Sequence, residues 1–233
     1  MSNGNNGESM LKAIIFDIDG TLIESQQWQY DTWVIVLNKY NVKLSKEYYV
    51  PNLLGVEAKV QEPILKKKFN LDLPEGQLMK EKEDLILKWV SEKELPIIDT
   101  VFEVLDDVKK HGLKIAFATS SPYEEARIKI KRAGFDKYSN ILVTRDDVKK
   151  SKPEPEIYLL TAEKLGVKFD ECAAFEDSLP GVKSSKNAGM YAIAVPTSWT
   201  QAQDFSCADF LARDIMQGWE HLKNKGLDEK KKV

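Results

Sequence analysis

The sequence contains few cysteines and histidines, and it has no long apolar run. Only two cysteines, Cys172 and Cys207, and two histidines occur among its 233 residues. Cys172 lies in the apolar stretch ECAAF, which favours a buried free thiol over a disulfide, so we expect a reducing, cytoplasmic setting. No apolar run approaches the roughly 20 residues of a membrane span, and the polar start has no signal-peptide core. We therefore expect no membrane partner.

An excess of charge of either sign is also absent. The 34 basic and 37 acidic residues give a formal net charge of -3. Proteins that bind nucleic acids usually carry a strong basic excess. The short lysine runs at residues 66–68 and 230–232 are typical of a solvated helix face and a frayed tail. The composition therefore predicts no nucleic-acid partner.

Five short apolar runs predict buried strands, and from the second run onward they alternate with helical patterns. These runs occupy residues 11–16, 114–118, 141–143, 172–175 and 191–195. The helical patterns between and after the later runs occupy residues 121–133, 154–165 and 178–188. Apolar strands that alternate with helices are typical of a parallel sheet covered on both faces. The predicted fold class is therefore α/β, with a Rossmann-like parallel sheet as its core.

One interval breaks this alternation. Helical patterns without a convincing strand run through residues 26–40, 56–69 and 77–90. An insert of about 70 residues can bury a small core of its own. We therefore predict the following division of the chain: a flexible leader at 1–10, an α/β core at 11–22 and 96–226, an inserted helical cap at 23–95, and a flexible tail at 227–233.

Acidic side chains follow the first and the fourth predicted strand. Asp17 and Asp19 end the first strand in the run FDIDGT, and Glu176 and Asp177 end the fourth. An Asp-Gly pair alone is also common in capped turns. Adjacent carboxylates at a buried strand end are harder to explain structurally, because uncompensated buried charge is unfavourable. A hard cation with oxygen ligands would compensate them.

Groups suited to binding an anion follow the second and third strands. Thr119 and Ser120 precede a helix, and Lys152 stands beside two prolines that precede another. Each feature alone fits an ordinary helix N-cap or a solvated lysine. Ligands collect at the carboxyl edge of a parallel sheet, however, and helix N-termini attract anions. The four strand ends together predict a site for phosphoryl transfer, which depends on positioning and charge neutralisation.

In this order and spacing, the four segments resemble the motifs of the haloacid dehalogenase-like hydrolase superfamily. The matching residues are Asp17-Ile18-Asp19-Gly20-Thr21, Thr119, Lys152 and Glu176-Asp177. Within the superfamily, the chain is similar to the sugar-phosphate phosphatase and β-phosphoglucomutase branch, and the resemblance includes a helical cap inserted after the first motif. The resemblance implies that Asp17 attacks phosphorus and becomes an aspartyl phosphate. It implies that Asp19 protonates the leaving oxygen and then takes a proton from water.

The resemblance also implies a Mg²⁺ cofactor. The ligands would be the Asp17 carboxylate, the backbone carbonyl of Asp19 and Asp177, with Glu176 as a neighbouring or direct ligand. The carboxylate at Asp19 excludes the dehalogenase and phosphonate-cleaving relatives, which lack an acid at this position.

The remaining motif residues would bind the phosphate. By the same resemblance, Thr119 and the backbone amide of Ser120 bind phosphate oxygens. Lys152 offsets the charge on the nucleophile and the phosphoryl group. The expected partner is a small phosphorylated metabolite, bound by a monomer.

The cap distinguishes a phosphatase from a mutase. Mutase relatives carry a histidine where this chain has Gln29, and an arginine in the loop after a Gly-Val pair, where residues 55–56 are followed by Glu-Ala-Lys. We therefore favour hydrolysis of a sugar or polyol phosphate. The alternatives are a β-phosphoglucomutase-like phosphosugar mutase and, less favoured, a binding protein without turnover. Trp28, Gln29 and Lys59 are the predicted cap contacts to the substrate, and Lys82 could match a remaining cap lysine of the relatives.

Overall fold

A six-stranded parallel sheet forms the centre of the computed structural model, which describes residues 10–56 and 58–226. The strands are β1 (Ala13–Phe16), β2 (Lys114–Ala118), β3 (Leu142–Val143), β4 (Cys172–Glu176), β5 (Tyr191–Ala194) and β6 (Phe210–Leu211). Their spatial order is β3-β2-β1-β4-β5-β6, and all neighbouring pairs are parallel. The predicted α/β fold is therefore confirmed. β6 was not predicted, because a strand of two residues leaves no apolar run to recognise.

The register of the central strands positions the site. All four residues of β1 are buried, and β1 pairs with both β2 and β4. Phe16 lies opposite Phe117 of β2 and Phe175 of β4. The backbone N–H of Asp17 continues this ladder by donating to the carbonyl of Phe175 at 3.0 Å. Because the strands run in the same direction, the residues that follow these three phenylalanines meet at one edge of the sheet.

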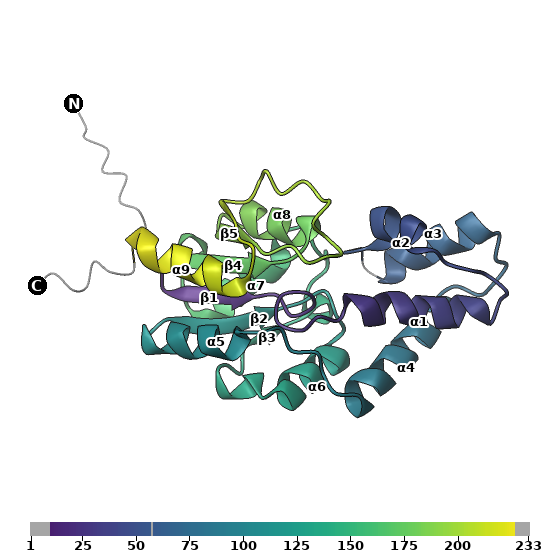
Figure 1. Cartoon of the computed structure of the whole chain (residues 1–233), viewed down its shortest axis with the longest axis horizontal. Coiled ribbons are helices and arrows are strands. Elements are labelled where there is room, and N and C mark those ends of the chain that lie inside the picture. The colour runs from purple at the N-terminus through teal and green to yellow at the C-terminus, as the bar shows by residue number, and fades with distance from the viewer. Residues whose placement is uncertain (1–9, 57, 227–233) are drawn as a thin grey trace, which may run out of the picture.

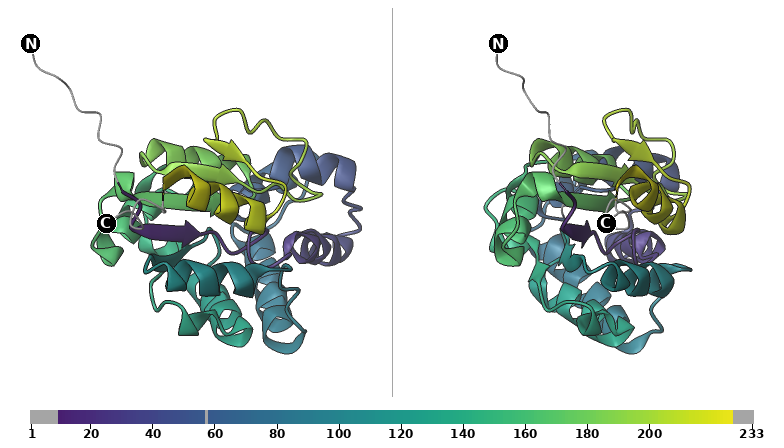
Figure 2. Two further views of the ribbon diagram at one scale, coloured as in Figure 1. Left: turned by 60° about the vertical axis from the view of Figure 1, so that its left-hand side comes forward. Right: turned by 90° about the vertical axis from the view of Figure 1, so that its left-hand side faces the viewer.

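Helices cover both faces of the sheet (Figure 2). The helices of the core are α5 (Val101–Lys110), α6 (Tyr123–Ala133), α7 (Glu156–Leu165), α8 (Leu179–Asn187) and α9 (Ile215–Gly226). Alternate strand residues point to opposite faces. Ile14 and Phe16 therefore share a hydrophobic cluster with α5, α6 and α9, whereas Ala13 and Ile15 share one with α7.

Four helices between β1 and β2 form the cap. They are α1 (Gln26–Asn38), α2 (Lys46–Leu53), α3 (Ala58–Phe69) and α4 (Gln77–Glu92). Figure 1 shows them gathered at one end of the molecule, and their shared hydrophobic cluster includes Trp33, Leu37, Tyr49 and Leu78. The predicted helical cap is confirmed. α2 is an addition to the prediction, because its 8 residues contain Pro51, which usually disfavours a helix.

The two connections between cap and core lie side by side. Ile23 forms a bridge with Ile97, and the N–H of Glu24 donates to the carbonyl of Pro96 at 2.8 Å. The division into core (11–22 and 96–226) and cap (23–95) stays a prediction. Residues 1–9 of the predicted leader at 1–10 and the whole predicted tail at 227–233 lie outside the described residues. Within 10–56 and 58–226, no helix is both long and apolar enough to cross a membrane.

Candidate active site

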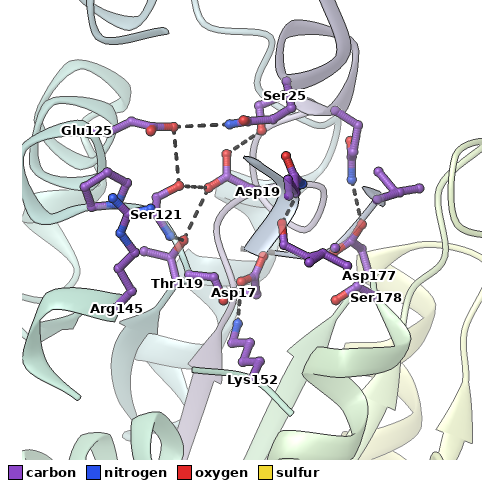
Figure 3. A pocket seen from close by; sticks show the side chains of 18 of the residues that line it. Asp17, Asp19, Ser25, Thr119, Ser121, Glu125, Arg145, Lys152, Asp177 and Ser178 are labelled. Atoms are coloured by element: carbon purple, nitrogen blue, oxygen red, sulfur yellow. Dashed lines mark hydrogen bonds and ion pairs between the residues drawn. The ribbon is translucent and has the colours of Figure 1, made fainter. Parts of the chain in front are cut away.

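A pocket lined by both cap and core collects most of the predicted site residues (Figure 3). From the core it is lined by Asp17, Asp19, Thr119, Ser120, Lys152 and Asp177, and from the cap by Gln29 and Lys82. Glu176 is buried beside Asp17, because Phe16 and Phe175 are paired in the register of β1 and β4. The strand ends thus bring together groups that lie as far apart in the sequence as Asp17 and Asp177.

Lys152 is held between two carboxylates. Its Nζ donates to Asp17 Oδ1 at 2.6 Å and to the carbonyl of Ala118 at 3.1 Å, and lies 2.5 Å from Glu176 Oε1. Burial alone would lower the pKa of Lys152, but the neighbouring Asp17 and Glu176 raise it above its ordinary value. Lys152 is therefore a buried ammonium group, aimed at the predicted nucleophile rather than at solvent.

The carboxylates of Asp17, Glu176 and Asp177 form a cluster suited to a cation. Each offers an oxygen, and these atoms lie within 4.8 Å of one another. Burial, followed by the neighbouring Glu176 and Asp19, raises the pKa of Asp17 to about 8 despite the ammonium of Lys152. Burial and the adjacent carboxylates also raise the pKa of Asp177 well above its usual range. Buried oxygen donors with this much mutual repulsion fit a hard divalent cation such as Mg²⁺.

Gly20 leaves room for this cluster. Its φ of +92° is in the left-handed region, and a Cβ there would lie 2.3 Å from Asp177 Oδ2. Asp177 Oδ2 also accepts a hydrogen bond of 2.6 Å from Gln26 Nε2 of the cap helix α1. The glycine of the DIDGT run therefore lets the first motif approach the fourth.

Asp19 accepts hydrogen bonds on both carboxylate oxygens. Lys129 Nζ donates to Oδ1 at 2.5 Å, and Ser25 donates to the same oxygen. Ser121 Oγ at 2.8 Å and Thr119 Oγ1 at 3.3 Å donate to Oδ2. Burial opposes ionisation of Asp19, but Lys129 and these hydrogen bonds outweigh it and lower the pKa of Asp19 to about 2. An anion bound beside Thr119 would raise this pKa again, because like charges disfavour ionisation.

Of the three predicted cap contacts, Trp28, Gln29 and Lys59, the described part of the pocket is lined by Gln29. Its Nε2 donates to Glu125 Oε1 at 3.3 Å, and its Oε1 accepts from Lys82. Trp28 instead packs edge-on against Trp89, with the ring centroids 6.1 Å apart. Lys59 is exposed and lies in a different surface hollow of the cap. The substrate contacts predicted for Trp28 and Lys59 gain no support from their positions and stay predictions.

Two buried charged residues of α6 were missed from the sequence. Lys129 is fully buried, pairs with Glu125 one turn away and also reaches Asp19. A Glu and a Lys four residues apart are also the usual pattern of a solvated ion pair on a helix surface. The signal in the sequence that could have indicated a role in the active site is that Glu125 and Lys129 lie on the helix that follows Thr119 and Ser120.

A parallel sheet with a helical cap, and an aspartate facing a lysine and two further carboxylates, define a class of hydrolase that acts on phosphate groups. A family model for haloacid dehalogenase-like hydrolases matches residues 14–195 of the sequence. The chain belongs to this family.

Individual relatives cover most of the chain. A phosphorylated carbohydrates phosphatase from Thermotoga maritima is 32% identical over 184 residues, which make up 77% of this chain and 82% of the relative. Protein CbbY from Rhodobacter capsulatus is 30% identical over 216 residues, 88% of this chain and 94% of the relative. The solved structure of CbbY from Rhodobacter sphaeroides in complex with phosphate matches with a TM-score of 0.79. It is 24% identical and covers 88% of this chain and 95% of that chain, a likeness that supports the fold.

Proposed function

We propose that the protein is a magnesium-dependent phosphatase that hydrolyses a small sugar or polyol phosphate through an aspartyl phosphate on Asp17. The family and the relatives named as phosphatases support phosphoric monoester hydrolase activity. The observation that carries the mechanism is the environment of Asp17. Its carboxylate lies in the pocket, paired with Lys152 and clustered with Asp177.

In the first step, an oxygen of Asp17 attacks phosphorus while the bond from phosphorus to the leaving oxygen breaks. The leaving oxygen takes a proton from Asp19. Lys152 Nζ, 2.6 Å from Asp17 Oδ1, orients that carboxylate and offsets the charge that it shares with the phosphoryl group. Thr119 and the amide of Ser120 hold phosphate oxygens in the segment just before α6, which begins at Tyr123.

In the second step, water attacks the phosphorus of the aspartyl phosphate and the bond to Asp17 breaks. The attacking water gives its proton to Asp19, which returns to its starting form, and phosphate is released. Bound Mg²⁺, held by Asp17, Asp177 and the Asp19 carbonyl with Glu176 beside them, would neutralise charge on the phosphoryl group.

The cap supports a small substrate. Gln29 and Lys82 reach the pocket from α1 and α4, so a bound molecule would be enclosed between them and the core. Trp28 and Lys59 are also proposed to contact the substrate from the cap. A cytoplasmic location and a monomeric state are likewise proposed from the sequence.

The test is a phosphate-release screen over sugar phosphates, polyol phosphates and nucleotides, with and without magnesium. We expect release from small sugar or polyol monoesters and none from Asp17→Asn. A mutase would instead move phosphate between positions of one sugar with little net release. Such a product, detected by NMR, would favour the mutase alternative.

A further inference from the structure

The wall of the pocket where cap and core meet, here called the cap-side wall, carries matched charges. Lys82 and Glu83 come from α4 of the cap, and Glu125 and Arg145 come from the core. Arg145 forms an ion pair with Glu83. Lys82 is buried, and Gln29 bridges it to Glu125, because the Gln29 Oε1 accepts from Lys82 and the Gln29 Nε2 donates to Glu125 Oε1. The two basic groups of this wall are thus balanced by two carboxylates before any substrate binds.

Glu125 is the most constrained of these four groups. Its side chain is 3% exposed, and its Oε1 accepts from Gln29 Nε2 and Ser121 Oγ, both at 3.3 Å, and from Lys129. Lys129 holds the carboxylate in place, but it is also paired with Asp19, so two carboxylates share its charge. Glu125 therefore places a fixed acceptor at the junction of cap and core.

The cap-side wall should bind a neutral substrate hydroxyl more favourably than a second phosphate group. A hydroxyl can donate to the Glu125 carboxylate or accept from the Lys82 ammonium. A second phosphate would bring two further negative charges close to Glu125 and Glu83. Among the described pocket-lining residues, the basic ones are Lys82, Arg145 and Lys152, and each already lies near a carboxylate. Like charges brought together in a partly desolvated site oppose binding strongly.

We infer that Glu125 is a specificity-determining residue that restricts the enzyme to monophosphates with a neutral, hydroxylated leaving group and excludes sugar bisphosphates. This inference rests on the proposed function, because it concerns the leaving-group side of the same pocket. The carboxylate acts through two properties: it accepts a substrate hydroxyl, and it repels a second phosphate.

The experiment measures two matched pairs of sugars as competitive inhibitors of p-nitrophenyl phosphate hydrolysis in magnesium. The pairs are fructose 6-phosphate with fructose 1,6-bisphosphate, and glucose 6-phosphate with glucose 1,6-bisphosphate. For the unaltered protein we expect the monophosphate to inhibit at least about tenfold more strongly than its bisphosphate. Glu125→Gln should bring the two inhibition constants within about threefold of each other.

Glu124→Gln is the matched control. Glu124 precedes Glu125 on α6, but it is exposed and pairs with Arg127. This variant should keep the inhibition ratio of the unaltered protein. Glu83→Gln is a second test variant. It removes the carboxylate that pairs with Arg145, so it should also improve bisphosphate binding. It tests the inference if Glu125→Gln does not fold, which thermal unfolding would reveal.

Several results would overturn the inference. They are equal inhibition by both members of a pair in the unaltered protein, failure of the monophosphates to inhibit, and an unchanged ratio in folded Glu125→Gln or, if that variant does not fold, in Glu83→Gln. Failure of the proposed function would look different. In that case p-nitrophenyl phosphate itself would not be hydrolysed in a manner that depends on Asp17 and magnesium.

Discussion

The two ends of the pocket are built on different principles. At the phosphate end, Asp17, Asp177 and Glu176 repel one another, and one buried lysine offsets them only in part. At the cap-side wall, Glu83 is paired with Arg145, and Gln29 bridges Glu125 and Lys82. The phosphate end is therefore suited to bind a cation, which would neutralise the carboxylates, together with a phosphate group. The cap-side wall is already neutral and suits an uncharged group.

The largest expected effect lies at the phosphate end. Asp17→Asn should lower kcat by at least about 10⁴-fold, because loss of a nucleophile removes the covalent route. The variant should fold, since the amide oxygen still accepts from Lys152. Phosphate release and circular dichroism check both points, with mass spectrometry to exclude deamidation. Substantial activity of the intact Asp17→Asn variant would refute the covalent mechanism.

The next effect tests the buried ion pairs that join the two ends. Lys129→Met should lower the free energy of unfolding by about 3–5 kcal/mol, because it leaves the buried Glu125 and the half-buried Asp19 without their shared cation. Urea denaturation measures the change. Lys131→Met, at an exposed position of the same helix, should change it little. Equal small losses from both variants would mean that the Lys129 contacts contribute little to stability.

Magnesium should distinguish the phosphate end from the cap-side wall. At about 100 times its Kd, Mg²⁺ should stabilise the unaltered protein by about 2.7 kcal/mol, seen as a higher Tm. Asp177→Ala should lose most of this increase, because one carboxylate of the cluster is missing. Gln29→Ala should keep it. An undiminished increase in Asp177→Ala would place the metal elsewhere, and full activity after chelation would refute the metal requirement.

The smallest effects are expected in the cap. Alanine variants of Trp28, Gln29 and Lys59 should alter the ratio of kcat/KM between substrates while leaving magnesium binding unchanged. Gln29→Ala should shift the ratio most, because Gln29 alone of the three lines the pocket, and Lys59→Ala least. The measurement compares each variant over several sugar and polyol phosphates. Uniform losses on every substrate would assign specificity to other cap residues.

The phosphate end could be predicted because its residues follow consecutive strands of a parallel sheet. Once β1, β2 and β4 pair in register, Asp17, Thr119 and Glu176 must meet at one edge. The buried position of Lys152 did not follow from its loop, where a lysine is usually solvated. It becomes understandable only when Asp17 and Glu176 are seen on either side of it.

The cap-side wall could not be predicted in the same way. Helical spacing correctly indicated α1, α3 and α4, but it did not show which helix face would meet the core. Trp28 and Gln29 are neighbours in the sequence, yet one packs on Trp89 and the other reaches Glu125. The tertiary packing of the cap determines which of the two side chains faces the pocket. Helical spacing of apolar residues does not indicate this packing.

The central claim is tested most directly by trapping the intermediate on Asp17. The protein would be mixed with magnesium and its best substrate from the screen, quenched during turnover and treated with borohydride, which reduces an aspartyl phosphate to homoserine. Peptide mass spectrometry should then find homoserine in place of Asp17, dependent on substrate. Turnover without this product, or with the change at Asp19 instead, would contradict the assignment of Asp17 as the nucleophile.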